Sequence, residues 1–557
     1  MERGGEMTLR AKMQKRMINL QSERNYFFDY WGELSDFFHA ARGRHLMKNK
    51  SKQPKRNTKQ YNNTPRIAVR TLASGMMSGI TSPARQWFKL SLSDKDLAES
   101  RAVREWLFNV QMKLYQVYSQ SNIYNMLHSV YAELGVFGTA DIGVYEDPKR
   151  IIRAKTFTAG SYMLAAGADG VIDTHYYEYQ KSVSELVKTF GYDSCSDTVK
   201  KAWDKGNIET MIDCVHVIEP NDNRNEISPL ASDMAFRSLY FEDGAKGDDP
   251  EFLHRSGFPE FPHMTPRWDV IGEEVYAHEC PAMMAIGDSK GLQLGERRFY
   301  QALDKVGNPP LQGPSDMKNH LKGGVPSPGS MSWHTPGSSG ISSVYGNYAP
   351  RIDFIRSAQE VAEARINEAF YKDLFLMLAS DNRNREITAR EVAERHEEKL
   401  IMLGPVLERL HAELLDPLID RTFNIMQRNG MLPAPPQELA DQELSVEYVS
   451  ILAQAQKAVG LGAIERTVGF AMEMSQVWPG AKHKINAQQT IDDYARNAGV
   501  DPQIIRSDDE AEQMSQAENQ MMQQQATLAS EGQAIDNMSK LAEVQQASDQ
   551  QAIERAV

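Results

Sequence analysis

Apolar residues recur with helical spacing over the first forty residues of the chain. Met17, Leu20, Phe27 and Leu34 follow one another at intervals of three or seven, which places them on one face of a helix. The pattern predicts a helix over about 8–40. A basic segment rich in proline and asparagine follows, and it interrupts the helical spacing.

A second helix is predicted from about Arg66, and it carries small residues four apart at Gly75 and Gly79. Such spacing favours membrane dimers only inside a long apolar segment, which is absent here, so close packing against another helix is expected. After Pro83 the stretch "WFKLSL" alternates as a strand does, and helix is expected again over about 96–133.

The period then changes from helical spacing to alternation. The stretches "ADIGVYED", "IIRAKTFTAGSYMLAAG", "VIDTHYYEYQ" and "IDCVHVIEP" alternate apolar and polar residues, with Gly and Asp between them, and one short helix is expected at "SVSELVKTFG". A strand-rich insert over about 140–280 is therefore predicted inside a mainly helical chain. The predicted fold class is α+β, mainly α-helical.

The middle of the chain predicts two helices around a Gly/Pro/Ser-rich segment. Leu292, Phe299, Leu303 and Val306 share one face of the first helix, and "GNPPLQGP" ends it because proline cannot extend a helix. About forty residues follow that are read either as a linker or as a small β module. Helix returns over 352–374.

The stretch "LFLMLASDNRNREITAREV" ends this helix and begins another at Thr388 with a capping-box sequence. The next helix is expected to reach Asn429–Gly430, bent by Gly404–Pro405 and Pro417. More helices are expected over about 436–505, for example at "VEYVSILAQAQKAVG". The last fifty residues are Gln/Ala/Glu-rich and contain no proline, so they are either disordered or helical when copies pack together.

Composition bounds the class of protein. With 557 residues, 41% hydrophobic and 25% charged, the chain has the composition of a globular protein of several domains. No apolar run approaches a membrane span of about 18 residues and no apolar signal sequence opens the chain, so we expect it to stay in the compartment where it is made. Three cysteines without CxxC spacing favour a reducing cytoplasm.

The net charge of −13 argues against a surface that coats DNA, but the charges are segregated. No acidic residue occurs between Asp36 and Asp94, and the segment 42–59 is strongly basic. Two interpretations stay open for this segment: a solvated loop, or a patch for an anionic partner.

Signatures of catalysis and of metal binding are missing from the sequence. No Gly-Lys pair occurs, which excludes a Walker A loop, and there is no GxSxG or HExxH. The histidines at 254, 263 and 278 near Cys280 lack ligand spacing, and the acidic cluster at Asp243, Asp248 and Asp249 lacks that of a calcium loop. We therefore expect no metal, no cofactor and no enzymatic activity.

The order of helix, Gly/Pro-rich module, helix, polar loop and long bent helix resembles that of bacteriophage portal proteins. The stretches "NTPRIAVRTLASGMMSGITSPARQWFKLSL" and "YAHECPAMMAIGDSKGLQ" resemble the head-to-tail connector proteins of short-tailed, T7-like phages. His278-Glu279-Cys280 stands where that family usually has small residues, which puts the local turn in doubt. The resemblance covers about 8–500.

The resemblance implies a portal-type fold with wing, stem, clip and crown regions. The corresponding segments are a wing at 1–280, a first stem helix at 281–310, a clip at 311–350, a second stem helix at 351–375, a tunnel loop at 376–388, a long wing/crown helix at 389–430, a crown at 431–507 and a C-terminal tail at 508–557.

The resemblance also implies which residues meet DNA or partner proteins. The tunnel-loop candidates are Asp381, Asn382, Arg383, Asn384 and Arg385. The stem candidates for the DNA channel are Lys290, Arg297, Arg298 and Lys305; the alternative is that they pair with Glu360, Glu363 or Glu368 of neighbouring helices. The clip candidates are Lys318, Lys322, Trp333 and His334; the alternative is that Trp333 packs the module.

The implied function is a ring, usually of twelve copies, at one capsid vertex. Double-stranded DNA passes through it without sequence readout during packaging and ejection. The implied partners are the packaging motor (terminase large subunit), the tail adaptor, and the major capsid and scaffolding proteins, with no membrane. The implied locations are the head-tail junction of the virion and, during assembly, the host cytoplasm. Two alternatives remain: a nucleic-acid-processing viral enzyme, or a scaffold held together by its tail.

Overall fold

The computed structural model describes most of the chain up to residue 449 and short pieces beyond it. The described ranges are 7–46, 60–92, 101–307 with gaps at 226, 229 and 246–248, then 311–312, 342–343, 352–379, 403–436, 439 and 444–449, followed by parts of 466–540. The chain forms two compact units, Met1–Ala453 and Gln454–Val557.

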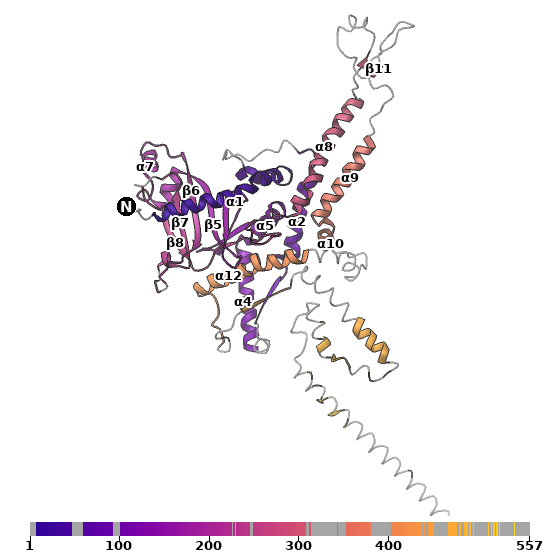
Figure 1. Cartoon of the computed structure of the whole chain (residues 1–557). Helices are drawn as coiled ribbons and strands as arrows, with labels where there is room; N and C mark the ends of the chain where they lie inside the picture. The colour runs from indigo at the N-terminus through magenta and orange to yellow at the C-terminus, as the bar shows by residue number, and fades with distance from the viewer. Residues whose placement is uncertain are drawn as a thin grey trace, which may run out of the picture. The chain divides into compact units, whose positions relative to one another are not determined.

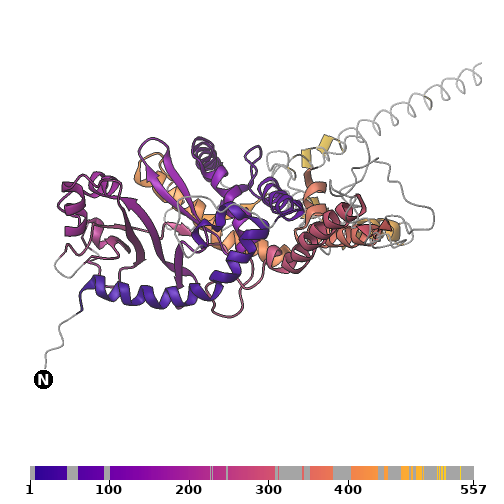
Figure 2. The same ribbon diagram turned by 90° about the horizontal axis from the view of Figure 1, so that it is seen from above.

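A five-stranded antiparallel sheet lies at one side of the first unit. Its order is β4 (Tyr162–Ala166), β5 (Ile172–Ser182), β6 (Met211–Pro220), β7 (Phe236–Glu242) and β8 (His254–Phe258). Helix α1 (Leu9–Phe38) lies along one face of this sheet, as Figures 1 and 2 show. Met13, Met17 and Leu20 of α1 share a core with strand residues such as Tyr176 and Phe241, which explains the helical spacing of the N-terminal segment.

A second, three-stranded sheet has the order β3 (Ile151–Phe157), β2 (Asp141–Asp147) and β9 (His263–Met264). Between β5 and β6 the chain forms α6 (Val183–Phe190) and α7 (Asp197–Asp204), which surround a small core that includes Cys195 and Cys214. Both thiols and that of Cys280 are buried and free. The predicted strand-rich insert and its short helix are therefore present.

Helices α2 (Thr64–Gly79) and α5 (Ile123–Phe137) pack together beside the sheets. Close packing at Gly75 is confirmed, since an added Cβ would lie 2.2 Å from the Phe375 ring of helix α10 (Lys372–Ala379). The absent side chain of Gly75 is thus what lets α10 lie against α2.

The single helix predicted over 96–133 is instead two helices, α4 (Arg101–Gln120) and α5, with a break at Ser121–Asn122. The Asn122 side chain accepts from the backbone N–H of Ala154 at 2.9 Å and donates to its carbonyl at 2.8 Å. The break therefore satisfies both backbone groups of a β3 residue, a contact that a continuous helix would prevent.

The helix predicted over 352–374 is also interrupted. Helix α9 (Ile352–Ala369) ends before Tyr371, whose φ of 52° lies in the left-handed region, and α10 begins at Lys372. The turn buries Phe370 and directs α10 toward α2. The helix end predicted at 374 is therefore wrong, because α10 continues to Ala379.

Residues 444–448 were expected to begin a helix and form a strand instead. Strand β12 (Leu444–Tyr448) pairs antiparallel with β1 (Phe88–Leu92), the strand predicted at "WFKLSL". Tyr448 also stacks on His411 with ring centroids 3.8 Å apart. The helix prediction failed because Val446 and Tyr448 suit a strand once a partner strand, far away in the sequence, is available.

The long helix predicted over 389–430 is described from residue 403. It is helical over 403–410, widens into a π-helical turn at His411–Leu415, and continues as α12 (Asp416–Arg428). The π-helical turn lies immediately before Pro417, which lacks the N–H of a regular helix. The helix is therefore irregular shortly before Pro417, and the bend expected there stays a prediction.

In the second unit, residues 466–475 form the longest described helical stretch. Among the residues that the structure describes, no helix combines the length and apolar character required to cross a membrane.

Replacing Gly75 by alanine is expected to destabilise the protein by about 1–3 kcal/mol, because the new methyl group overlaps the Phe375 ring. Gly32→Ala is the matched control within a helix: nothing lies within 4 Å of its added Cβ, so a gain of about 0.5–1 kcal/mol is expected. Chemical denaturation of both variants measures the difference. Equal stability of the two variants would contradict the close packing of α2 and α10.

Candidate functional site

Two long helices form an antiparallel hairpin that we call the stem. Helix α8 (Pro281–Gly307) and α9 lie side by side, as Figure 1 shows. The ends of the segment between them also meet, since β10 (Leu311–Gln312) pairs with β11 (Ser342–Ser343). The two predicted helices around the Gly/Pro/Ser-rich segment are therefore confirmed.

A set of hydrogen bonds fastens the stem to the rest of the first unit. The Gln293 side-chain oxygen accepts from the backbone N–H of Tyr61 at 2.6 Å and of Asn62 at 2.8 Å, and its amide donates to the Asn62 carbonyl at 2.9 Å. The Asn62 side chain donates to Glu296 of α8 and to Glu363 of α9. The residues just before α2 thus hold both stem helices at once.

We call this group of Asn62, Gln293, Glu296 and Glu363, together with the Tyr61 backbone, the stem clasp. Gln293 is buried. Sequence reasoning did not find the clasp. The one available signal was a glutamine placed next to Leu292, on the apolar side of a predicted amphipathic helix.

The positive side chains predicted for the stem fall into two groups. Lys290 forms an ion pair with Glu33 of α1 at 2.7 Å, rather than with Glu360, Glu363 or Glu368. Arg297, Arg298 and Lys305 are exposed and form no ion pair with a described residue. Glu360 instead pairs with Arg356, at 3.9 Å.

An apolar row remains exposed on the stem. On α8 it consists of Tyr300 (57% exposed), Leu303 and Val306 (50%), three residues apart, and on α9 of Phe354 (62%) and Val361, seven apart. Leu292 is buried as predicted, whereas Leu303 and Val306, predicted for the same face, are largely exposed. The apolar face of α8 is thus covered next to the clasp and uncovered beyond it.

The other predicted contact residues lie outside the described residues. These are Asp381, Asn382, Arg383, Asn384 and Arg385 of the polar loop and Lys318, Lys322, Trp333 and His334 of the segment between the stem helices.

Arg42, at the start of the basic segment 42–59, forms an ion pair inside the fold. Arg42, in the 3₁₀ helix η1 (Ala40–Leu46), forms a 2.7 Å ion pair with the buried Glu133 of α5 and donates to Thr158. Burial raises the pKa of Glu133 to about 7, an effect that the charge of Arg42 opposes. Arg42 therefore neutralises a buried carboxylate, while 47–59 lies outside the described residues.

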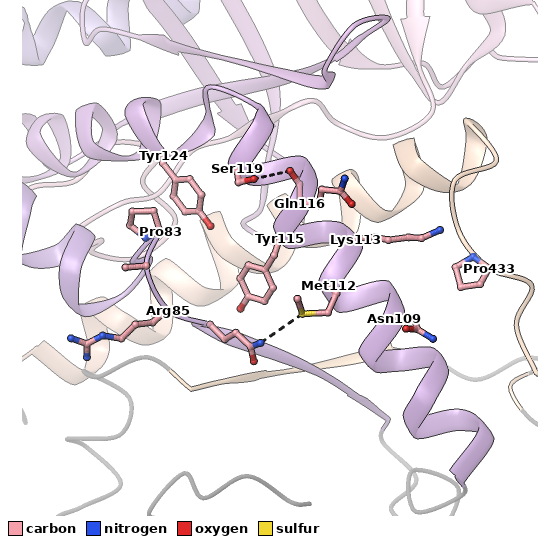
Figure 3. A pocket seen from close by; sticks show the side chains of 12 residues that line it. Pro83, Arg85, Asn109, Met112, Lys113, Tyr115, Gln116, Ser119, Tyr124 and Pro433 are labelled. Carbon is pink, nitrogen blue, oxygen red and sulfur yellow. Dashed lines mark hydrogen bonds between the residues drawn. The ribbon is translucent and has the colours of Figure 1, made fainter.

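An open pocket of about 810 Å³ is lined by residues of the 83–86 turn and α4 and by Pro433; Figure 3 shows these side chains. Its most buried polar group, the Tyr115 hydroxyl, already accepts from the N–H groups of Trp87 and Phe88 and donates to the Phe88 carbonyl. Lys113 donates to the Met431 carbonyl. Ser119 donates to the carbonyl of Gln116, so the hydrogen bonds of these lining groups go to the backbone and do not join a nucleophile to a base.

The comparison with known protein families agrees with the resemblance noted from the order of elements in the sequence. A family model described as "Bacteriophage head to tail connecting protein" matches residues 10–505. The chain belongs to this family. Head-to-tail connecting proteins are structural, so the expectation of a non-enzymatic chain is confirmed, and the alternative of a nucleic-acid-processing enzyme loses its support.

Two relatives match this connecting protein over nearly all of its length. The "Portal protein" of Salmonella phage epsilon15 is 39% identical over 546 residues, covering 98% of this chain and 97% of the relative. The "Probable portal protein" of Bordetella phage BPP-1 is 40% identical over 541 residues, covering 97% and 96%. By its family, the chain is thus a phage portal protein. Its location is the head-tail junction of the virion.

Solved structures of gene transfer agent particles also match the connecting protein. The neck of an empty particle gives a TM-score of 0.34 at 11% identity, covering 79% of this chain and 91% of that chain. A native virion gives 0.32 at 10% identity, covering 78% and 99%. TM-scores this low do not establish a shared fold.

Gln293→Ala is expected to destabilise the protein by about 1–3 kcal/mol, because it leaves the N–H groups of Tyr61 and Asn62 without an acceptor. The control is Gln301→Ala, at an exposed position of the same helix, which should change stability by less than about 0.5 kcal/mol. Chemical denaturation compares the two. Similar stability of both variants would show that the clasp does not hold the stem.

Proposed function

We propose that copies of this chain, usually twelve, form a ring at one capsid vertex that conducts double-stranded DNA during packaging and ejection. The observation that carries the proposal is the stem, which exposes an apolar row in the single chain. The near full-length likeness to portal proteins of two phages supports it. The proposed fold is of the portal type, with wing, stem, clip and crown regions.

The apolar row supports side-by-side packing of the stems. Burying one large apolar side chain contributes about 1.5–3 kcal/mol relative to leaving it exposed. A two-helix hairpin can bury only part of the apolar surface of its helices, and Tyr300, Val306 and Phe354 stay exposed in the single chain. Stems of neighbouring copies, related by a rotation that closes, would cover these residues through a head-to-tail interface.

The charges of the stem support a channel for DNA. Arg297, Arg298 and Lys305 would recur in every copy and give rings of positive charge in an otherwise acidic assembly, since each chain carries a net charge of −13. Contacts to phosphate are independent of sequence, and each added contact strengthens binding. A few positive rings would therefore centre the duplex without holding it in place.

The remaining assignments belong to the same proposal. Asp381, Asn382, Arg383, Asn384 and Arg385 would form a tunnel loop around the DNA. Lys318, Lys322, Trp333 and His334 would belong to a clip that docks the terminase large subunit and later the tail adaptor. The wing would face the major capsid and scaffolding proteins, and assembly would take place in the host cytoplasm.

Leu303→Asp is expected to weaken ring formation, because it places a charge in the apolar row of α8. The matched control is Gln301→Asp, which adds the same charge to an exposed polar position of the same helix. Sedimentation velocity should show wild type and Gln301→Asp as large assemblies and Leu303→Asp mainly as single chains. Equal assembly of all three would argue against stem-to-stem packing.

Arg297→Glu combined with Arg298→Glu is expected to leave rings intact but lower the DNA content of phage heads several-fold, because like charges then repel the phosphates. The control is Lys201→Glu on α7, an exposed charge outside the stem. DNA per particle is measured after complementation of a phage lacking this protein. Normal filling with the stem variant would refute the assignment of these arginines to the channel.

A further inference from the structure

Three side chains that bind metals in many proteins meet in the interior of the first unit. Asp141 lies at the start of β2, His175 in β5 and His263 in β9. The side chains of Asp141 and both histidines are fully buried. The cluster therefore joins the three-stranded sheet to the five-stranded sheet at a place without access to solvent.

The polar atoms of the cluster converge on one point. Nδ1 of His263 lies 2.9 Å and 3.1 Å from the two oxygens of Asp141, and Nε2 of His175 lies 2.8 Å from Oδ2. One ligand atom from each residue lies within 4.8 Å of those of the other two. The two imidazole rings stack with centroids 3.8 Å apart. Each ring has one nitrogen next to the Asp141 carboxylate.

His175 is the unexplained member of the group. Its Nε2 lies 2.8 Å from Oδ2 of Asp141 with poor hydrogen-bond alignment, and its buried Nδ1 has no hydrogen-bond partner among the described residues. A buried polar group without a partner costs about 1–3 kcal/mol. A ligand between His175 and Asp141 would remove this cost.

We propose that Asp141, His175 and His263 bind one divalent transition-metal ion, most suitably Zn²⁺, which joins the two sheets of the first unit. A metal bound about 2.1 Å from both a nitrogen and an oxygen lies off the line between those atoms. The nitrogen lone pair then points at the metal and away from the oxygen. A nitrogen close to a carboxylate oxygen but not aligned with it, as in His175, fits this arrangement.

The surroundings supply the outer contact that metal-binding histidines need. The Tyr145 hydroxyl lies 2.9 Å from Nε2 of His263, the nitrogen opposite the one that faces Asp141. With the metal on Nδ1, the Nε2–H of His263 donates to the tyrosine oxygen, which fixes the orientation of the ring. Phe157 packs edge-on against His175, so the cluster is enclosed by aromatic rings.

The ligand set indicates which ions fit and what the ion does. Two imidazoles and one carboxylate suit zinc and related first-row metals, whereas magnesium and calcium prefer oxygen ligands alone. The second oxygen of Asp141 is available for a fourth bond. Because the site is fully buried, the ion stabilises the fold and has no access to a substrate.

The sequence indicates no metal site because the ligands are far apart along the chain. His263 was considered only with His254, His278 and Cys280, and the structure groups it with Asp141 and His175 instead. The separations of 34 and 88 residues match no ligand motif. Only the pairing of strands brings the three side chains together.

The first test measures metal in the full-length protein, produced without a histidine tag in medium containing Zn²⁺. Elemental analysis is expected to find about one zinc per chain in the wild type and in His254→Gln, which changes an exposed histidine of β8. His175→Phe, which keeps an aromatic ring but removes both nitrogens, should lower zinc to background. Zinc retained by His175→Phe would overturn the proposal.

The second test does not depend on whether a variant folds. Wild-type protein is treated with a chelator and titrated with Co²⁺, whose visible spectrum reports nitrogen and oxygen ligands in a tetrahedral site. The expected result is a band that saturates at one ion per chain, together with a rise in Tm that Zn²⁺ also produces. Absence of both the band and the Tm shift in the wild type would overturn the proposal.

Discussion

A pair of packed helices cannot bury the apolar surface of both, and the proposed function depends on this limit. In the stem, Leu292 and Ile366 are buried, whereas Tyr300, Val306 and Phe354 are exposed. The stem clasp holds the hairpin in one orientation through Gln293 and Asn62. The exposed apolar row is thereby presented to a neighbouring copy as a defined surface.

The location of the packing partners decides which parts of the fold could be predicted from the sequence. Helices α1, α2, α8 and α9 follow from the spacing of their apolar residues, because the helical period is present within each segment whatever the segment packs against. The break at Asn122, the turn at Tyr371 and strand β12 depend on partners far away in sequence, namely Ala154, helix α2 and strand β1. No local pattern contains that information, so these predictions were wrong.

The positively charged residues selected from the sequence divide into those that form an ion pair in the structure and those that are exposed. Charge alone selected Lys290 and the basic 42–59 segment, but Lys290 pairs with Glu33, and Arg42 neutralises the buried Glu133. The partners of these cations come from other elements, which the sequence pattern does not reveal. Arg297, Arg298 and Lys305 are exposed on the stem, and the role beside DNA that we propose for them rests on that exposure.

The central claim is that copies of the chain close into a ring around a channel. Electron microscopy of the purified protein, with class averages viewed down the particle axis, tests it most directly. The account predicts closed rings with a central hole wide enough for a DNA duplex and a countable number of subunits. Closed particles without a hole, or open filaments of stacked chains, would contradict it.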